Sequence, residues 1–187
     1  MPFDTLWVEG PMARTVEDLA LMLDSMVGHD IGDPLSFKSK TGCFIESLKI
    51  DLNPISIAVS EDLNLVPVDS KVRKVFKTAI NNLSKHGLEI NDDIPDFSGV
   101  LDAFKTLRGV LMASMLGDLV KTHKNSILED IRKYVQVGFD AKSLDIIEAE
   151  KTRRKLTSNM ENFFRKHNFL ICPSASVPPF SVDKPYI

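Results

Sequence analysis

The sequence predicts an α/β fold that is rich in helix and has few strands. Apolar residues recur at helical spacing in five stretches, which together cover about half of the chain. Short β-branched or apolar segments at 55–59, 88–90 and 169–172 are typical of strands. A strand, a helix and a strand follow one another between residues 55 and 90, which indicates a βαβ unit of a parallel sheet.

The first predicted helix runs from Val16 to Val27. Thr15 is a good N-cap, and Asp18 three residues later can bond back to the amide of the cap. Gly28 then supplies a stop. From residue 29 to 53 no period is sustained. A loop of this length is unusual in a compact domain unless it is functional or covers a surface supplied elsewhere.

Four further helices are predicted in the second part of the chain. Asp69 caps the first of them, and Gly87 ends it. A capping box of Ser126 and Glu129 opens the third, which closes near Gly138. The four helices are expected at about 70–86, 98–120, 127–138 and 143–166.

The predicted helices carry more apolar surface than three short strands can cover. An α/β core with so few strands would leave much of that surface in contact with water. Either another segment completes the sheet, or the chain associates with itself. A homo-oligomer formed through exposed apolar helix faces is therefore one expectation.

Composition argues against a strongly charged partner. The formal net charge is −3, and Lys and Arg are dispersed among Asp and Glu, so we expect neither nucleic acid nor a membrane surface as partner. No apolar run approaches the roughly 20 residues of a membrane span, and no signal peptide is visible. Cys43 and Cys172 make no disulfide framework, and Cys172 is expected to be a small buried thiol. A reduced, cytoplasmic setting is the expectation.

Most motifs of known chemistry are missing from the sequence. The nine glycines include no Gly-Gly pair and form no phosphate-binding loop, dinucleotide fingerprint or nucleophile elbow. The four histidines share no metal-binding spacing, so we expect no metal and no cofactor. Each histidine is expected on the surface or at a helix end: His29, His86, His123 and His167.

One loop remains as a candidate binding site. Residues 173–180 are rich in proline and directly follow a predicted strand, and loops beyond the carboxyl ends of strands are where α/β proteins place ligands. The hydroxyls of Ser174 and Ser176 could contact a substrate, could include a nucleophile, or could belong to a structural turn. A nucleophilic serine needs a positioned base, and no histidine or lysine is identifiable as its partner.

Two segments of the chain resemble the amidase-signature hydrolases. The first is Gly10-Pro11-Met12-Ala13-Arg14-Thr15-Val16, which opens an amphipathic helix and is followed by Asp33-Pro34. The second is Phe169-Leu170-Ile171-Cys172-Pro173 with Val177-Pro178-Pro179-Phe180, which is similar to the late strand and proline-rich turn of these enzymes. The elements between them fall in the family's order, so the resemblance covers almost the whole chain.

The resemblance implies a partial α/β/α sandwich around a mixed sheet, in a family that hydrolyses amides or transfers ammonia from them. It also implies a Ser–cis-Ser–Lys triad with both serines in or near a Gly-Gly-Ser-Ser-Gly-Gly loop. In that triad a neutral lysine accepts a proton through the bridging serine, and glycine-loop amides stabilise the oxyanion. This machinery should lie upstream of Gly10, and no Gly-Gly-Ser occurs in the sequence, so no catalytic residue is assigned.

We therefore expect residues 1–187 to be a single domain, the C-terminal portion of an amidase-signature domain truncated at both ends. Its expected role is that of an amidase fragment, inactive alone, which supplies scaffold and substrate-pocket wall for a small amide bound by the parent enzyme. Ser174, Ser176 and the helix at 98–120 are the expected contributors to that wall. Two alternatives stay open: a non-catalytic scaffold that works by association, and part of the A-type subunit of a tRNA-dependent amidotransferase.

Overall fold

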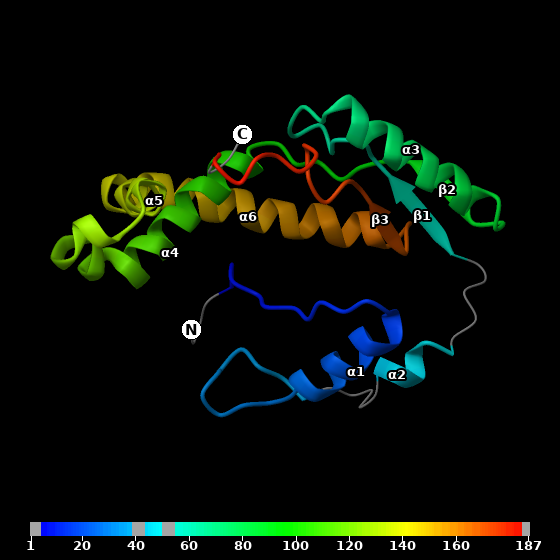
Figure 1. Cartoon of the computed structure of the whole chain (residues 1–187), viewed down its shortest axis with the longest axis horizontal. Helices are drawn as coiled ribbons and strands as arrows, with labels where there is room; N and C mark the ends of the chain where they lie inside the picture. Colours follow the sequence, from blue (N-terminus) through cyan, green and yellow to red (C-terminus); the bar gives the residue numbers. More distant parts are fainter. Residues whose placement is uncertain (1–4, 39–43, 50–54, 185–187) are drawn as a thin grey trace. The chain divides into compact units, whose positions relative to one another are not determined.

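The computed structural model describes residues 5–38, 44–49 and 55–184. The chain divides into two compact units, Met1–Leu52 and Asn53–Ile187, and the first is the smaller (Figure 1). The expectation of one domain over residues 1–187 stays a prediction.

In the first unit, α1 (Val16–Met26) begins where the sequence predicts it. The amide of Asp18 donates to Oγ1 of Thr15 at 3.1 Å, which satisfies one of the unpaired N–H groups at the start of the helix. The helix ends one residue earlier than predicted, and Val27 is its C-cap.

A short helix, α2 (Phe44–Ser47), lies within the segment predicted to be a loop. Its four residues are too few to produce a helical period in the sequence. The carboxylate of Asp24 at the end of α1 accepts hydrogen bonds from the amides of Phe44 and Ile45, and the second of these measures 3.2 Å. Asp24 thereby links the two helices of this unit. Cys43 lies outside the described residues.

The second unit is built on a three-stranded sheet. Its strands are β1 (Ser56–Val59), β2 (Glu89–Asp92) and β3 (Phe169–Ile171), and their order is β2-β1-β3. Both pairs are parallel, with Ile57 opposite Ile90 on one side and Phe169 on the other. The predicted parallel βαβ unit is therefore confirmed, and the central strand is the first one in the chain.

The connection from β1 to β2 and the connection from β2 to β3 run across the sheet in opposite directions. The helix α3 (Ser70–Ser84) joins β1 to β2, whereas three helices join β2 to β3 across β1. Right-handed crossovers that run in opposite directions put their helices on opposite faces of a sheet. In Figure 1, α3 lies along one side of the strands and α6 along the other. The carboxyl ends of all three strands thus meet at one edge.

The longer connection contains α4 (Val100–Thr122), α5 (Glu129–Asp140) and α6 (Ser143–Phe164). The capping box predicted from Ser126 and Glu129 is wrong. Ser126 ends a single 3₁₀ turn, in which its amide bonds to the carbonyl of His123 at 2.9 Å, and Leu128 is the N-cap without a side-chain bond. Ser126 therefore belongs to a turn that ends three residues before α5 begins and does not cap the helix.

Glycines bring α4 and α5 together. A Cβ on Gly138 would collide with the carbonyl of Gly109 and would approach the Cβ of Ala113 at 2.7 Å. A Cβ on Gly117 would lie 2.7 Å from the ring of Phe139. The sequence predicts that α5 ends near Gly138, but the helix continues to Asp140. Gly138 is not a helix stop, because it is the point at which α5 packs against α4.

The core of the second unit is small. Ala58 in β1 is fully buried and Val135 in α5 is almost so, whereas Val75 in α3 is 70% exposed and Leu128 is 74% exposed. Apolar helix faces therefore stay uncovered in the described part of the chain. None of the described helices is both long enough and apolar enough to cross a bilayer.

Replacing Gly138 with Ala is expected to destabilise the second unit by about 1–3 kcal/mol, the usual cost of overpacking. The clash with Gly109 outweighs the gain in helix propensity of up to about 1 kcal/mol. Urea unfolding followed by circular dichroism measures the change. Gly10→Ala is the control, because a Cβ at that position meets nothing within 4 Å. Equal stability of the Gly138 variant would contradict the close contact.

Candidate functional site

The candidate site lies at the carboxyl edge of the sheet, where two loops are joined by main-chain hydrogen bonds. The amide of Ser60, just after β1, donates to the carbonyl of Ile171 at 3.0 Å. The amide of Asp69, the N-cap of α3, donates to the carbonyl of Ser176 at 2.8 Å. The proline-rich turn is therefore fixed to the start of α3.

The loop after β1 contains an unusual backbone. Leu63 and Asn64 have φ angles of 53° and 54°, a left-handed conformation that side chains with a Cβ rarely adopt. Two hydrogen bonds stabilise it: Leu63 N donates to Ser60 Oγ and Asn64 N donates to Asp62 Oδ1, both at 2.9 Å. Such strain costs about 1–3 kcal/mol and clusters at functional sites.

Ser174 and Ser176 line a small hollow of about 190 Å³ together with the loop after β1. Ser174 is exposed and Ser176 is half-buried. Among the described residues, neither hydroxyl has a hydrogen-bond partner and no base is positioned beside it. Such hydroxyls are available to a ligand, but they lack the activation that a nucleophile needs. Cys172 lines the same hollow and is half-buried, so its expected full burial is wrong.

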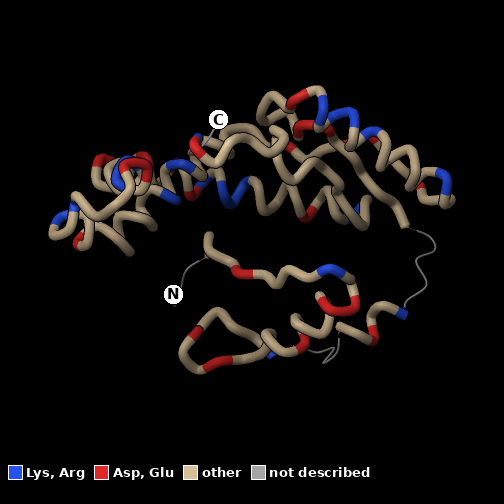
Figure 2. Tube along the Cα trace, viewed as in Figure 1, with Lys and Arg blue, Asp and Glu red and all other residues tan. Residues whose placement is uncertain are grey.

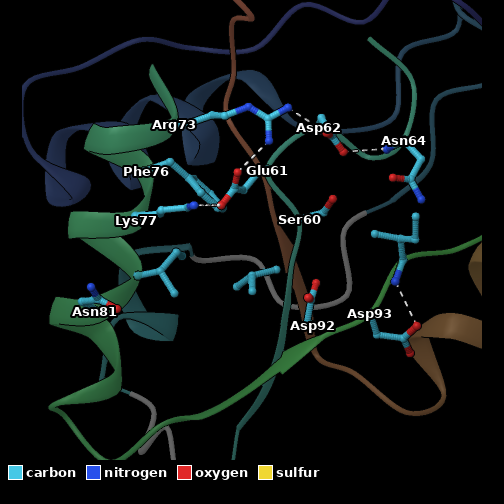
Figure 3. Close-up of a pocket in the computed structure, with 13 residues that line it drawn as sticks. Ser60, Glu61, Asp62, Asn64, Arg73, Phe76, Lys77, Asn81, Asp92 and Asp93 are labelled. Atoms are coloured by element: carbon cyan, nitrogen blue, oxygen red, sulfur yellow. Dashed lines mark hydrogen bonds and ion pairs between the residues drawn. The ribbon is translucent and has the colours of Figure 1, made fainter. Parts of the chain in front are cut away.

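A larger hollow of about 590 Å³ lies between α3 and the ends of β1 and β2 (Figure 3). The hollow lies beyond the carboxyl ends of β1 and β2, the edge of a parallel sheet at which α/β proteins bind ligands. Polar side chains dominate the labelled lining, which includes Ser60, Asn64, Asn81 and Asp92.

Four charged side chains form a compensated cluster in this hollow. The Arg73 guanidinium donates to Glu61 at 2.7 Å and to Asp62 at 2.9 Å, and Lys77 lies 2.9 Å from the other oxygen of Glu61 (Figure 3). The hydrogen bonds of Lys77 and then Arg73 lower the pKa of Glu61. The backbone amide of Asn64 and then Arg73 lower the pKa of Asp62. Both carboxylates therefore stay ionised, and Arg73 fixes the loop to α3.

The first turn of α4 lines a third hollow, of about 580 Å³, with residues 63–65 and 94–99. Only the first three residues of α4 line this hollow. The rest of the helix, which was predicted at 98–120 to line a pocket, lies outside it. Asp96 anchors this region because it accepts from Ser98 and from Lys155 on α6, and these bonds lower its pKa.

A buried histidine network was missed by the sequence analysis. His167 is 8% exposed, its Nε2 lies 3.0 Å from Oδ2 of Asp93, and its Nδ1 lies 3.1 Å from Oγ of Ser56. His167 lies directly after the end of α6, as one of the two expectations has it, but it is buried rather than on the surface, whereas the other three histidines are exposed. Ser56 and Asp93 precede His167 by more than 70 residues, so no local pattern could reveal the contact.

The order of this network, serine to histidine to carboxylate, is that of a nucleophile relay. Its position argues for a structural role, because Oγ of Ser56 also accepts from Asn91 on the neighbouring strand at 3.2 Å. The network joins β1, the end of β2 and the start of β3. No group of His, Cys, Asp and Glu that could bind a metal occurs among the residues that the structure describes.

Residues 3–186 match the sequence model of the family described as Amidase. An amidase of Pseudomonas putida is 25% identical over 177 residues, which cover 90% of this chain and 36% of the relative. The A subunit of a glutamyl-tRNA(Gln) amidotransferase of Alcanivorax borkumensis is 25% identical over 198 residues, which cover 92% of this chain and 40% of the subunit. The crystal structure of a bacterial aryl acylamidase of the amidase-signature family matches with a TM-score of 0.79 at 20% identity, over 91% of this chain and 37% of that chain.

The chain belongs to the amidase family. The predicted resemblance is confirmed, and so is the helix-rich α/β fold class. The chain spans less than half the length of the relatives described above. This agrees with the interpretation of the chain as a fragment of an amidase-family protein.

Replacing Asp93 with Asn is expected to lower stability at pH 7 by less than about 1 kcal/mol, because Asp93 is 45% exposed and its pair with His167 is screened. The hydrogen bond from His167 lowers the pKa of Asp93 in the folded chain. Its stabilisation is therefore present above the unfolded pKa of about 3.9 and is lost as pH falls through the folded pKa.

Urea unfolding at pH 7, 4 and 3 tests this dependence. The gap between the parent chain and the Asp93→Asn variant should close as the pH falls. Asp92→Asn is the matched control, because the side chain of Asp92 makes no hydrogen bond or ion pair with the described residues. A gap that stays constant over the three pH values would contradict the ionic contribution.

Proposed function

We propose that this chain forms part of an enzyme that hydrolyses carboxylic amide C–N bonds, and that its carboxyl-edge loops form one wall of the substrate pocket. The observation that carries the proposal is the family match over residues 3–186 in a chain without the Gly-Gly-Ser segment of the triad. The substrate is a small amide, and the chain alone is inactive.

The carboxyl-edge hollows support this assignment. Ser174 and Ser176 present hydroxyls without a partner among the described residues, and Ser60 and Asn64 line the neighbouring hollow. Polar groups of this kind orient a ligand through hydrogen bonds, whereas the reaction needs an activated nucleophile and an oxyanion site. We therefore assign binding to this chain and the chemical steps to the triad-bearing segment of the family.

The isolated chain is expected to hydrolyse no anilide and to take no label from a serine-reactive fluorophosphonate. Ser174 and Ser176 have no positioned base among the described residues, and Ser56 already accepts a bond from Asn91. Intact-protein mass spectrometry measures the labelled fraction, with a labelled serine hydrolase as positive control. Stoichiometric labelling of any serine would contradict the assignment.

A hybrid enzyme tests the pocket wall. The part of the Pseudomonas putida amidase that lies outside the match is joined to this chain, and the hybrid is expected to hydrolyse an amide. Ser174→Ala in the hybrid should raise KM about two- to tenfold with little change in kcat, the effect of one lost hydrogen bond in binding. Ser181→Ala is the control, because Ser181 lies outside the hollows and, among the described residues, its hydroxyl bonds only to Asp183. A fall in kcat alone would contradict a binding role for Ser174.

Two other functions compete with this proposal. The match to the amidotransferase A subunit favours a role in ammonia transfer, which the same hybrid would reveal through glutamine-dependent rather than amide-dependent activity. The exposed apolar side chains of α3 and α5 favour a scaffold that works by association, including self-association. Sedimentation of the isolated chain at several concentrations separates a monomer from an oligomer.

The setting that we propose is the cytoplasm, without nucleic acid or membrane as partner. Lys and Arg are interspersed with Asp and Glu over most of the second unit, and acidic residues outnumber basic ones in the first (Figure 2). On α3, which carries no acidic residue, Arg73 and Lys77 are paired with Glu61 and Asp62, so no long unpaired basic stripe is offered to a polyanion. Cys172 is a free thiol, which suits a reducing compartment.

A further inference from the structure

An exposed surface on α4 and α5 combines aromatic rings with positive charge. It consists of Leu101, Phe104, Lys105 and Arg108 on α4 and Tyr134 on α5, and it is called the α4–α5 patch below. Within the second unit these two helices lie away from the sheet (Figure 1). Of the patch residues only Leu101 lines a carboxyl-edge hollow, whereas Phe104, Lys105, Arg108 and Tyr134 line none of them.

Arg108 is positioned by two rings that come from different helices. Its guanidinium carbon lies 5.8 Å from the ring centroid of Phe104 and 5.6 Å from that of Tyr134, both within cation–π range. Rings that flank a guanidinium leave its N–H groups to form hydrogen bonds at the edge. Among the described residues, no carboxylate or carbonyl accepts from them.

The surroundings leave this charge uncompensated. Lys105 lies on the same face of α4 and has no ion-pair partner in the described part of the chain. On α5, Glu129 and Asp130 both lie near Lys133, at 2.9 and 3.8 Å. Asp102 is about 120° around the helix from Arg108 and borders the patch at Lys105, three residues later, without forming an ion pair with it. The five patch residues themselves carry two positive charges and no negative one.

The apolar part of the patch is half-exposed. Leu101, Phe104 and Tyr134 expose 47%, 48% and 45% of their surface, respectively. Tyrosine and arginine dominate the residues that contribute most to protein–protein binding, and aromatic residues and arginine are enriched at interfaces. Four of the five patch residues line none of the hollows described above, so the patch suits a protein segment better than a small molecule, which needs a concave pocket.

We propose that the α4–α5 patch binds an acidic protein segment. A carboxylate of the partner forms a bidentate pair with Arg108, and a neighbouring apolar side chain packs on Phe104 and Tyr134. Charge complementarity identifies the partner, because the patch offers an oriented fork of donors and two cations without a carboxylate. This interaction is independent of the amide chemistry proposed above.

The test uses the full 187-residue chain and a short helical peptide with Glu and Leu at alternating turns on one face. Binding is followed in a ¹⁵N correlation spectrum by the backbone amide signals of α4 and α5 and, where Arg108 is present, by its side-chain Nε–H signal. The Glu peptide is expected to shift that signal with a Kd below about 1 mM, and added salt should weaken binding. The same peptide with Gln in place of Glu should bind at least about tenfold more weakly.

Substitutions of Arg108 test whether its guanidinium forms the contact with the peptide. Arg108→Gln should weaken the Glu peptide about tenfold or more, as loss of a central arginine does. Arg108→Lys should weaken it as well, because an ammonium makes no bidentate pair. Arg154→Gln is the matched control, since Arg154 is exposed on α6, outside the patch, and should leave the Kd unchanged. Circular dichroism verifies that each variant folds.

Three results would overturn the proposal. The first is no shift of the Arg108 signal by the Glu peptide, and the second is equal binding of the Gln peptide. The third is self-association of the parent chain that Arg108→Gln abolishes, because the occupant of the patch would then be a second copy of this chain.

Discussion

The second unit depends on the parallel pairing of β1 along both of its edges. Ala58 at the centre of this four-residue strand is fully buried, and its neighbour Ile57 is nearly so. Parallel neighbours cannot be joined by a tight hairpin, so each pairing requires a crossover. Since β2 and β3 lie on opposite sides of β1, the crossovers cover opposite faces. The loops after the strands then meet at one edge, where the hollows are.

The buried side chain of His167 stabilises the pairing of the three strands. A buried imidazole without partners would cost a few kcal/mol, and here both ring nitrogens have one. With Nε2–H donating to Asp93, Nδ1 accepts from the hydroxyl of Ser56, and that oxygen accepts from Asn91. A shift of any strand by one residue would break this chain of bonds. The network therefore specifies the register of three strands that are too short to specify it by themselves.

Local patterns predicted the strands and all the described α-helices except the four-residue α2 to within a few residues. The period of apolar residues and the caps Thr15 and Asp69 act over one or two turns, so a single sequence contains them. Ser126 was misread because the same residue type favours a helix cap and a 3₁₀ turn. The candidate site was only partly predictable: Ser174 and Ser176 follow a recognisable strand, whereas the pairing of Arg73 with Glu61 and Asp62 depends on how the loop after β1 folds back. The contacts of His167 join distant segments and leave no local signal.

The surface of the α4–α5 hairpin is determined by the packing beneath it. Arg108 lies between one ring from α4 and one from α5, so the spacing of the two helices sets the gap that its guanidinium fills. That spacing is short because Gly109, the next residue, faces Gly138 without a side chain between them. Each added atom at this crossing would push the helices apart and move Tyr134 away from Arg108. A pair of interior glycines thus orients a charged side chain on the outside, which limits the ordering cost when an acidic partner binds.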